Sequence, residues 1–338
     1  MPEKGLQELQ DYLGTSRRIL IASHRNPDGD ALGSSLGLAL YWTQRGHQVT
    51  VILPSMYPAD FGWMPGIENV LIFDDQEALV VEKIEEAELF VFLDFNHLSR
   101  IDKMGEPMEG KDTPVLLIDH HLEPDLSHEY YYVDPTASST ADLLFDVLTR
   151  WENAQYLDDQ LITTCLYTGI VTDTGTFAYN TSSSLFAKVG NMLRCPIDHI
   201  ALQNRINNSL TEKQLSLLGF CLHHRLIVLP EQQTGIIYLT KTDYAKFEIE
   251  RGDTEGIVNY ILKINNIKIA AFFTQQPTIV KLSLRSVENY NVADLAKKYF
   301  NGGGHKNAAG GSHYKGLKSA MELFKTVLPE FVNQQTNE

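Results

Sequence analysis

Cysteine is scarce in this chain, with only Cys165, Cys195 and Cys221 among 338 residues. Their scattered positions lack the paired spacing of a disulfide framework or a zinc knuckle, which argues against both. Free cysteines are often buried as small hydrophobic residues, and we expect the same here.

Long apolar runs and positive charge are also lacking. No run reaches 18 apolar residues, and residues 1–10 have no apolar signal core, so we expect a cytoplasmic protein that does not interact with membranes. The 28 lysine and arginine residues are outnumbered by 43 aspartate and glutamate residues, which gives a net charge of -15. This balance disfavours long duplex nucleic acid, because cationic side chains must neutralise its phosphates. A short anionic substrate is compatible with it, since bound divalent cations would reverse the local charge at a carboxylate-rich site.

The chain does contain a regular alternation of apolar strands and helices. Its length predicts two domains, residues 1–185 and 225–338, joined by a helical linker at 186–224 with the boundary between the lobes near Ser209. The alternation is typical of βαβ units and predicts an α/β fold, a mostly parallel doubly wound sheet followed by a smaller α/β domain. The predicted strands of the first domain are 18–23, 49–53, 88–94, 116–118 and 130–133. Its predicted helices are 6–13, 31–42, 77–87 and 140–150, and 100–114 is predicted to be a surface loop.

Histidines and aspartates follow four apolar segments, each of which we interpret as ending near the same edge of the sheet. In open α/β sheets, ligands bind outside the carboxyl ends of the strands, so we expect these side chains to converge. One such residue alone is more often a turn or cap residue than a ligand. The residues concerned are His24, Asp28, Asp30, Asp94, Asp119, His120, His121 and Asp173.

The donor types in this set indicate a metal. Imidazole and carboxylate ligands without thiolate suit first-row divalent ions and point to Mn²⁺ before Zn²⁺. Clustered acids would also repel one another strongly unless cations neutralised them.

Several motifs together resemble one enzyme family. The first part of the chain contains HRNPDGDALG (24–33), Asp94, DHH (119–121) and TDTG (172–175), and the later part contains VKLSLRS (280–286) and GGGHKNAAGG (302–311). In this order they resemble the DHH phosphoesterase superfamily and the DHHA1 domain that accompanies one branch of it. The resemblance implies a DHH catalytic domain at 1–185 and a DHHA1 substrate-binding domain at 225–338.

The resemblance also implies roles for the residues of the first domain. His24 and Asp28 would hold one divalent ion, and Asp30, His120 and Asp173 the other, with Asp94 bridging the two. Such a pair can share a hydroxide that attacks phosphorus in line. Asp119 would orient a histidine ring, and His121 would face the phosphate, either stabilising charge or donating a proton.

Other polar residues near these motifs have two interpretations. For His97 and Arg100 we favour a structural ion pair or a solvated loop over a role at the site. Ser138 and Ser139 could touch a phosphate, but helix capping accounts for them at least as well.

The later motifs predict a second set of substrate contacts. Three glycines allow backbone N–H groups to gather around an anion, although their spacing matches neither a Walker loop nor a dinucleotide fingerprint. Arg285 would add a planar fork suited to phosphate. The predicted substrate-binding residues are Arg285, Ser286, Gly302, Gly303, Gly304 and His305.

The resemblance is greatest to compact enzymes that act on small nucleotides. We therefore expect a manganese-dependent phosphoesterase that hydrolyses very short single-stranded RNA (nano-RNA) or 3'-phosphoadenosine 5'-phosphate, with the second lobe holding the rest of the substrate across a cleft. A linear-dinucleotide (pApA or pGpG) phosphodiesterase, an exopolyphosphatase or pyrophosphatase, and a noncatalytic nucleotide sensor are the alternatives. The resemblance also implies a homodimer.

Overall fold

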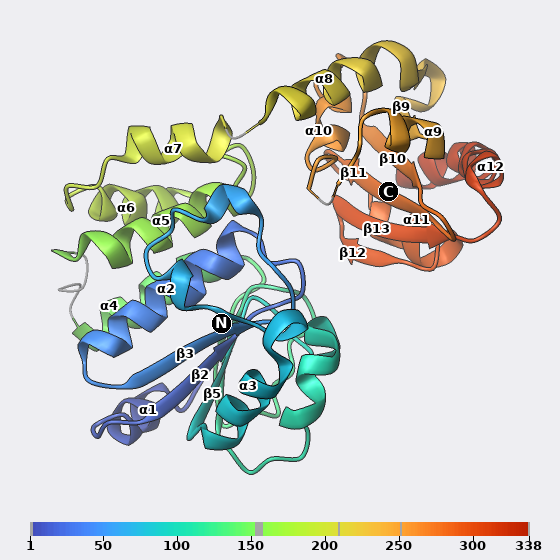
Figure 1. The fold of residues 1–338 in the computed structure, drawn as a ribbon. Coiled ribbons are helices and arrows are strands. Elements are labelled where there is room, and N and C mark those ends of the chain that lie inside the picture. Colours follow the sequence, from blue (N-terminus) through green and yellow to red (C-terminus); the bar gives the residue numbers. More distant parts are fainter. Residues whose placement is uncertain (1–2, 153–157, 209, 251, 337–338) are drawn as a thin grey trace. The chain divides into compact units, whose positions relative to one another are not determined.

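The computed structural model describes residues 3–152, 158–208, 210–250 and 252–336, and the side chains of Glu152, His305 and Thr336 are outside this description. The chain divides into two compact units, Met1–Ser209 and Leu210–Glu338, which are coloured from blue to yellow-green and from yellow to red in Figure 1. The helical segments 186–208 and 210–224 belong to different units. The three-part division inferred from the sequence stays a prediction.

The first unit is built on a seven-stranded sheet, which confirms the mostly parallel fold. Neighbouring strands are parallel except for the antiparallel pair formed by β1 and β7. In sheet order the strands are β1 (Glu3–Lys4), β7 (Tyr130–Val133), β6 (Val115–Asp119), β5 (Leu89–Leu93), β2 (Arg18–Ala22), β3 (Gln48–Leu53) and β4 (Leu71–Ile72).

Apolar residues on both faces of the strands explain why helices cover both sides of this sheet. In β2, Ile19 and Ile21 pack with the helices of one side, while Leu20 and Ala22 pack with those of the other. The first side contains α1 (Leu6–Tyr12), α2 (Gly29–Gln44), α4 (Thr140–Glu152), α5 (Gln160–Asp173), α6 (Ser183–Met192) and α7 (His199–Asn207). The second contains α3 (Phe73–Glu86) and the 3₁₀ segment η3 (Leu98–Met108).

Asp173 ends the helix α5, which is buried on nearly all sides. The last turns of such a helix cannot be told from a buried strand by sequence pattern. One local prediction for this unit was wrong. The segment expected to be a surface loop contains η3, whose residues Ile101, Met104 and Met108 are buried against the sheet. These buried residues are on average 3.5 positions apart, which is a helical spacing. The polar residues, glycine and proline between them hide this pattern in the sequence.

The second unit contains a six-stranded mixed sheet in which β9 and β10 form the parallel pair. In order its strands are β12 (Gly303–His305), β13 (Ala308–His313), β11 (Val280–Ser286), β10 (Ile269–Gln275), β9 (Thr234–Leu239) and β8 (Leu226–Leu229). The helices α11 (Val292–Tyr299) and α12 (Leu317–Thr336) cover one face. The other face is covered by α8 (Glu212–Phe220), α9 (Lys241–Lys246) and α10 (Ile257–Ile261).

The glycine segment of this unit forms part of a strand. Gly303 and Gly304 pair with Gly310 and Ala309 in a narrow antiparallel hairpin. A side chain on Gly302 would overlap the Gly310 carbonyl, and Gly304 has a φ of 140° with the Ala308 carbonyl 2.5 Å from a would-be Cβ. Close backbone approach therefore requires glycine here.

Within the described residues, no helix has both the length and the apolar character needed to cross a membrane. The cytoplasmic location inferred from the sequence stays a prediction.

Candidate metal centre

The first loop of the site is fixed by local hydrogen bonds. At the end of β2 the Ser23 hydroxyl donates to the Leu93 carbonyl at 2.8 Å, which ties this loop to β5. Asp28 then caps α2, because its Oδ1 accepts the N–H groups of Asp30 and Ala31, both at 3.0 Å. The cap places Asp28 Oδ1 4.0 Å from His24 Nε2.

Asp94 lies at the centre of the cluster, directly after β5. Its φ of 65° is unusual for a residue other than glycine, and such strain is often found at functional sites. The carboxylate is almost fully buried, with Oδ2 3.4 Å from His24 Nε2 and Oδ1 3.4 Å from His120 Nε2. The Thr140 hydroxyl donates to Oδ1 at 3.1 Å. Asp94 thus contacts a histidine from each of two loops.

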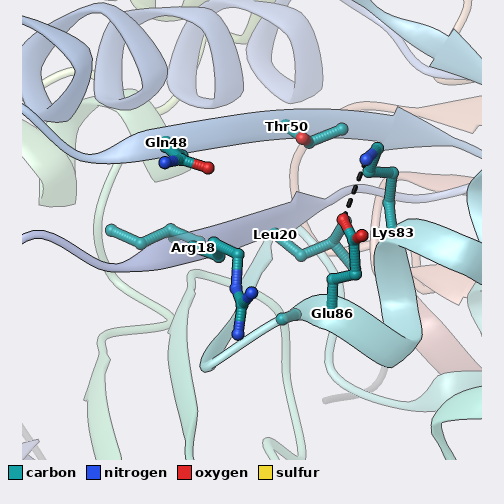
Figure 2. A pocket seen from close by; sticks show the side chains of 8 residues that line it. Arg18, Leu20, Gln48, Thr50, Lys83 and Glu86 are labelled. Carbon is teal, nitrogen blue, oxygen red and sulfur yellow. Dashed lines mark hydrogen bonds and ion pairs between the residues drawn. The ribbon is translucent and has the colours of Figure 1, made fainter.

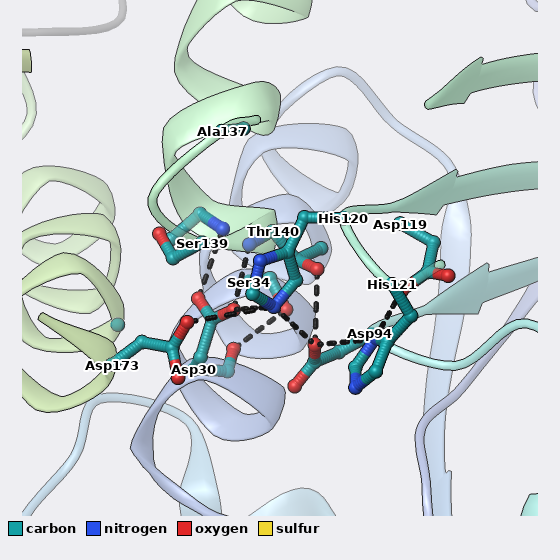
Figure 3. A network of polar contacts seen from close by, with 12 residues as sticks. Asp30, Ser34, Asp94, Asp119, His120, His121, Ala137, Ser139, Thr140 and Asp173 are labelled. Atoms are coloured by element: carbon teal, nitrogen blue, oxygen red, sulfur yellow. Dashed lines mark hydrogen bonds and ion pairs between the residues drawn. The ribbon is translucent and has the colours of Figure 1, made fainter. Parts of the chain in front are cut away.

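The start of α4 holds a second buried carboxylate. Asp30 Oδ2 accepts the N–H of Thr140 at 2.6 Å, and Oδ1 accepts that of Ala141 at 2.9 Å (Figure 3). These otherwise unpaired donors at a helix N-terminus favour a negative charge. Gly169 of α5 makes room for this arrangement, since a Cβ there would be 2.8 Å from Asp30 Oδ1.

His120 connects Asp30 to the last carboxylate. Its Nε2 is 4.0 Å from Asp30 Oδ2 and 3.4 Å from Asp173 Oδ2, and Figure 3 shows all three side chains pointing toward one another. The structure therefore brings together residues from the ends of β2, β5, β6 and α5. Three overlapping groups could hold a metal ion: His24, Asp28 and Asp94; Asp30, His120 and Asp173; and Asp94, His120 and His121.

The charges of the cluster are strongly coupled without cations. Burial, together with the negative charges of Asp94 and Asp173, raises the pKa of Asp30 well above its ordinary value. Burial likewise raises the pKa of Asp173 to about 7. Burial also opposes ionisation of Asp94, but hydrogen bonds from His120 and His24 outweigh it and hold the pKa of Asp94 below its ordinary value.

The two histidines respond in the opposite direction. Burial by itself would lower their pKa values, but the contact with Asp94 raises the pKa of His24 to about 9 and that of His120 to about 10. Buried carboxylates thus need positive charge here, which protons on the imidazoles would supply in the absence of metal. Nitrogen and oxygen donors crowded around buried acids fit divalent cations.

A second chain of contacts runs beside the cluster. His121 Nδ1 is 2.7 Å from Asp119 Oδ1, and Asp119 is fully buried. On the other side of the ring, Arg100 Nη2 lies 3.4 Å from His121 Nε2. The interpretation of Arg100 as a structural ion pair or solvated residue missed this contact. Its position shortly after Asp94, at the same sheet edge, was the available signal. His97 is exposed.

The two serines before α4 have structural partners. Ser139 Oγ accepts the N–H of Asp142 at 3.0 Å, and Ser138 donates to Asp142 Oδ2 through both its N–H and its hydroxyl, each at 3.1 Å. Asp142 also pairs with Lys188 at 2.5 Å. Helix capping therefore accounts for Ser139, and hydrogen bonds to the Asp142 carboxylate account for Ser138.

The predicted substrate contacts of the second unit lie on neighbouring strands. Arg285 and Ser286 end β11, and β13 lies between them and the strand that contains Gly303 and Gly304. The Ser286 hydroxyl donates to the Tyr290 carbonyl at 2.6 Å and is buried. Gly302 precedes β12, the backbone of His305 ends it, and the side chain of His305 lies outside the described residues.

Arg285 differs from most half-buried cations. Burial lowers its pKa from the ordinary value, and the negative charge of Glu255 offsets this only in part. Its guanidinium donates to the Leu284 carbonyl at 2.9 Å. Among the described residues no carboxylate is within ion-pair distance of its guanidinium. A desolvated cation without a directly paired anion is energetically unfavourable, so this position suits an anionic ligand.

The small cavity in Figure 2 lies elsewhere in the first unit. Its volume is about 60 Å³, and Arg18 and Gln48, the first residues of β2 and β3, contribute to its wall. It therefore opens at the amino ends of the strands, whereas the metal candidates follow their carboxyl ends. Lys83 in its wall is paired with Glu86 at 2.8 Å.

Comparison with known proteins gives consistent matches across the chain. Residues 18–170 match the N-terminal domain of the DHH family, and residues 233–334 match the DHHA1 domain. The crystal structure of an exopolyphosphatase-related protein from Bacteroides fragilis superposes with a TM-score of 0.93 at 33% identity, covering 98% of this chain and 97% of that one.

Two further proteins extend the comparison. The bifunctional oligoribonuclease and PAP phosphatase NrnA of Bacillus subtilis is 27% identical over 301 residues, which is 88% of this chain and 89% of that protein. RecJ of Thermus thermophilus, solved in complex with Mn²⁺, shares the fold with a TM-score of 0.54 at 14% identity, over 99% of this chain and 55% of RecJ. The agreement of both domain matches with the near-complete superposition on the Bacteroides structure shows that this chain is a phosphoesterase of the DHH/DHHA1 family.

Proposed function

We propose that this phosphoesterase hydrolyses very short single-stranded RNA and 3'-phosphoadenosine 5'-phosphate with two divalent ions, of which Mn²⁺ suits the donors best. The observation that carries the proposal is the sharing of Asp94 between donor groups that contain His24 and His120. A pure binding protein has no need for an acid in that position. The activity named for the Bacillus subtilis relative supplies the substrate class, and the manganese complex of RecJ supports the choice of metal.

The proposed ligands divide into two sets that share Asp94. His24 and Asp28 complete the first set, and Asp30, His120 and Asp173 complete the second. Divalent ions bound there would polarise phosphoryl oxygens and lower the pKa of coordinated water. Two backbone N–H groups orient the Asp30 carboxylate, and the Thr140 hydroxyl orients the Asp94 carboxylate.

Residues outside these sets position the phosphate. The contact of His121 Nδ1 with Asp119 Oδ1 at 2.7 Å fixes the orientation of the ring, which keeps Nε2 on the side away from Asp119. We propose that His121 contacts the scissile phosphate from that side. No serine or cysteine nucleophile is required, and the three cysteines are buried free thiols.

The second unit would bind the remainder of the substrate. Among the described residues no carboxylate lies within ion-pair distance of its half-buried Arg285, so a second phosphate of a nucleotide would be a suitable ligand. The backbone of Gly302, Gly303 and Gly304 would complete this contact, and His305 stays a predicted substrate-binding residue. The Ser286 hydroxyl already donates to the Tyr290 carbonyl, which favours a role for Ser286 in shaping the strand end.

An exopolyphosphatase is the second candidate, because the Bacteroides fragilis protein that superposes with a TM-score of 0.93 is described as exopolyphosphatase-related. A substrate panel separates the candidates. It contains 5'-phosphorylated RNA dimers to pentamers, pApA, pGpG, 3'-phosphoadenosine 5'-phosphate, polyphosphate, pyrophosphate and a long duplex, each with Mn²⁺.

We expect the short RNAs and the bisphosphate nucleotide to be hydrolysed fastest. Asp94→Asn and Asp173→Asn should reduce hydrolysis to background while the fold is retained, and Asp294→Asn, on an exposed turn of α11, serves as the matched control. Rapid cleavage of polyphosphate or pyrophosphate with inert nucleotides would overturn the proposal. Tight nucleotide binding without any hydrolysis would instead indicate a sensor. Light scattering of the same samples tests the homodimer.

A further inference from the structure

Two arginines near the candidate metal centre have very different partners. The guanidinium of Arg25, the residue after His24, is bonded to Asp74 at 2.8 and 3.2 Å and to Asp102 at 3.2 Å. Two carboxylates therefore neutralise this cation. Arg25 has little charge left to offer an anionic substrate.

Arg100 has no such neutralisation. Its side chain is exposed, and among the described residues no carboxylate lies within ion-pair distance of its guanidinium. Its guanidinium contacts His121, with Nη2 3.4 Å from Nε2 of the ring. A guanidinium has five N–H donors and accepts no hydrogen bond, so this contact leaves most donors available.

The backbone of Arg100 is nevertheless held in a defined place. Its carbonyl accepts the N–H of Arg25 at 2.9 Å, and its own N–H donates to the His97 carbonyl at 2.9 Å. The next residue, Ile101, is fully buried in the core between the sheet and the side covered by α3 and η3. The guanidinium thus extends from a fixed point beside the His24 loop, which reduces the entropy lost when it binds a ligand.

We propose that Arg100 binds a non-bridging oxygen of the scissile phosphate beside His121. This inference rests on the proposed function, because it takes a phosphoryl group as the ligand. A planar guanidinium matches two phosphate oxygens at once. It also supplies a positive charge next to a cluster whose protein side chains include the carboxylates of Asp30, Asp94 and Asp173.

The test compares Arg100→Met with Lys103→Met. Lys103 is an exposed cation three residues further along η3, so its removal makes the same change in net charge. We expect kcat/KM to fall about 100-fold in Arg100→Met, as for the loss of one preorganised donor to a reacting group. Lys103→Met should stay within about two-fold of the wild type, as expected for a screened surface charge, and both variants should bind Mn²⁺ like the wild type. Added guanidinium ion should partly restore Arg100→Ala, whereas Arg100→Lys should stay impaired because ammonium lacks the planar fork.

Binding of inorganic phosphate to the manganese-loaded protein separates this inference from the proposed function. Weaker phosphate binding by Arg100→Met than by Lys103→Met supports the assignment of Arg100, even if no nucleotide is hydrolysed by the wild type. Equal phosphate affinity and equal kcat/KM in the two variants would overturn it. Loss of Mn²⁺ binding in Arg100→Met would overturn it as well, because the residue would then support the metal centre and not the phosphate.

Discussion

Alanine at Gly169 should disturb the Asp30 carboxylate through direct steric overlap. The added Cβ would lie 2.7 Å from Ala141 Cβ and 2.8 Å from Asp30 Oδ1. Neither neighbour can move easily, since Ala141 lies in the first turn of α4 and its N–H donates to Asp30 Oδ1 at 2.9 Å. Overpacking of a rigid core typically destabilises a protein by about 1–3 kcal/mol. Against this, alanine in a helix is favoured over glycine by about 1 kcal/mol.

A second glycine separates the two effects. Gly190 is exposed on α6, and a Cβ there would meet nothing within 4 Å. Gly190→Ala should therefore gain helix propensity without overlap. The difference in the free energy of unfolding between the two variants isolates the steric cost, and we expect Gly169→Ala to be lower by about 1–3 kcal/mol.

Urea unfolding with EDTA present measures this difference, and titration calorimetry with Mn²⁺ measures the effect on the site. We expect Gly169→Ala to bind Mn²⁺ about 10- to 100-fold more weakly, the range seen when groups that orient metal ligands are disturbed. If Gly169→Ala were as stable as Gly190→Ala and bound Mn²⁺ like the wild type, the reasoning from close packing to site geometry would be refuted.

Three other perturbations test the ion pairs, the second unit and the metals. Lys188→Met should lower the free energy of unfolding by about 1–3 kcal/mol, because Lys188 pairs with Asp142 at 2.5 Å and Asp146 at 2.7 Å; an equal effect from the exposed Lys297→Met would contradict this. Arg285→Met should leave the free energy of unfolding unchanged or raise it, which chemical unfolding measures. The same variant should raise the KM for nucleotides about ten-fold or more, which steady-state kinetics measures. Mn²⁺ at about 100 times its Kd should raise the free energy of unfolding by about 2.7 kcal/mol relative to EDTA, as measured by scanning calorimetry. The same gain in Asp94→Asn would argue against Asp94 as a ligand.

Much of this protein could be predicted because the relevant signals are local. Apolar runs of strand length determined the positions of β2, β5 and β6, and the alternation with helices determined that the sheet is mostly parallel. The positions of His24, Asp94 and His120 directly after those strands followed from the same patterns. Parallel strands present their carboxyl ends at one edge of the sheet, so the sequence alone predicts that these residues converge.

Tertiary structure alone decided the features that depend on neighbours distant in sequence. The sequence already predicted Asp173 in the cluster, but its approach from the end of α5 depends on the close packing at Gly169 that brings α5 against Asp30. The glycines at 302–304 form a hairpin edge because β13 provides the partner strand. Arg100 contacts His121 because burial of the neighbouring Ile101 fixes η3 against the sheet. The sequence of a segment determines whether that segment favours helix or strand. Contacts between segments far apart in the sequence depend on how their side chains pack together.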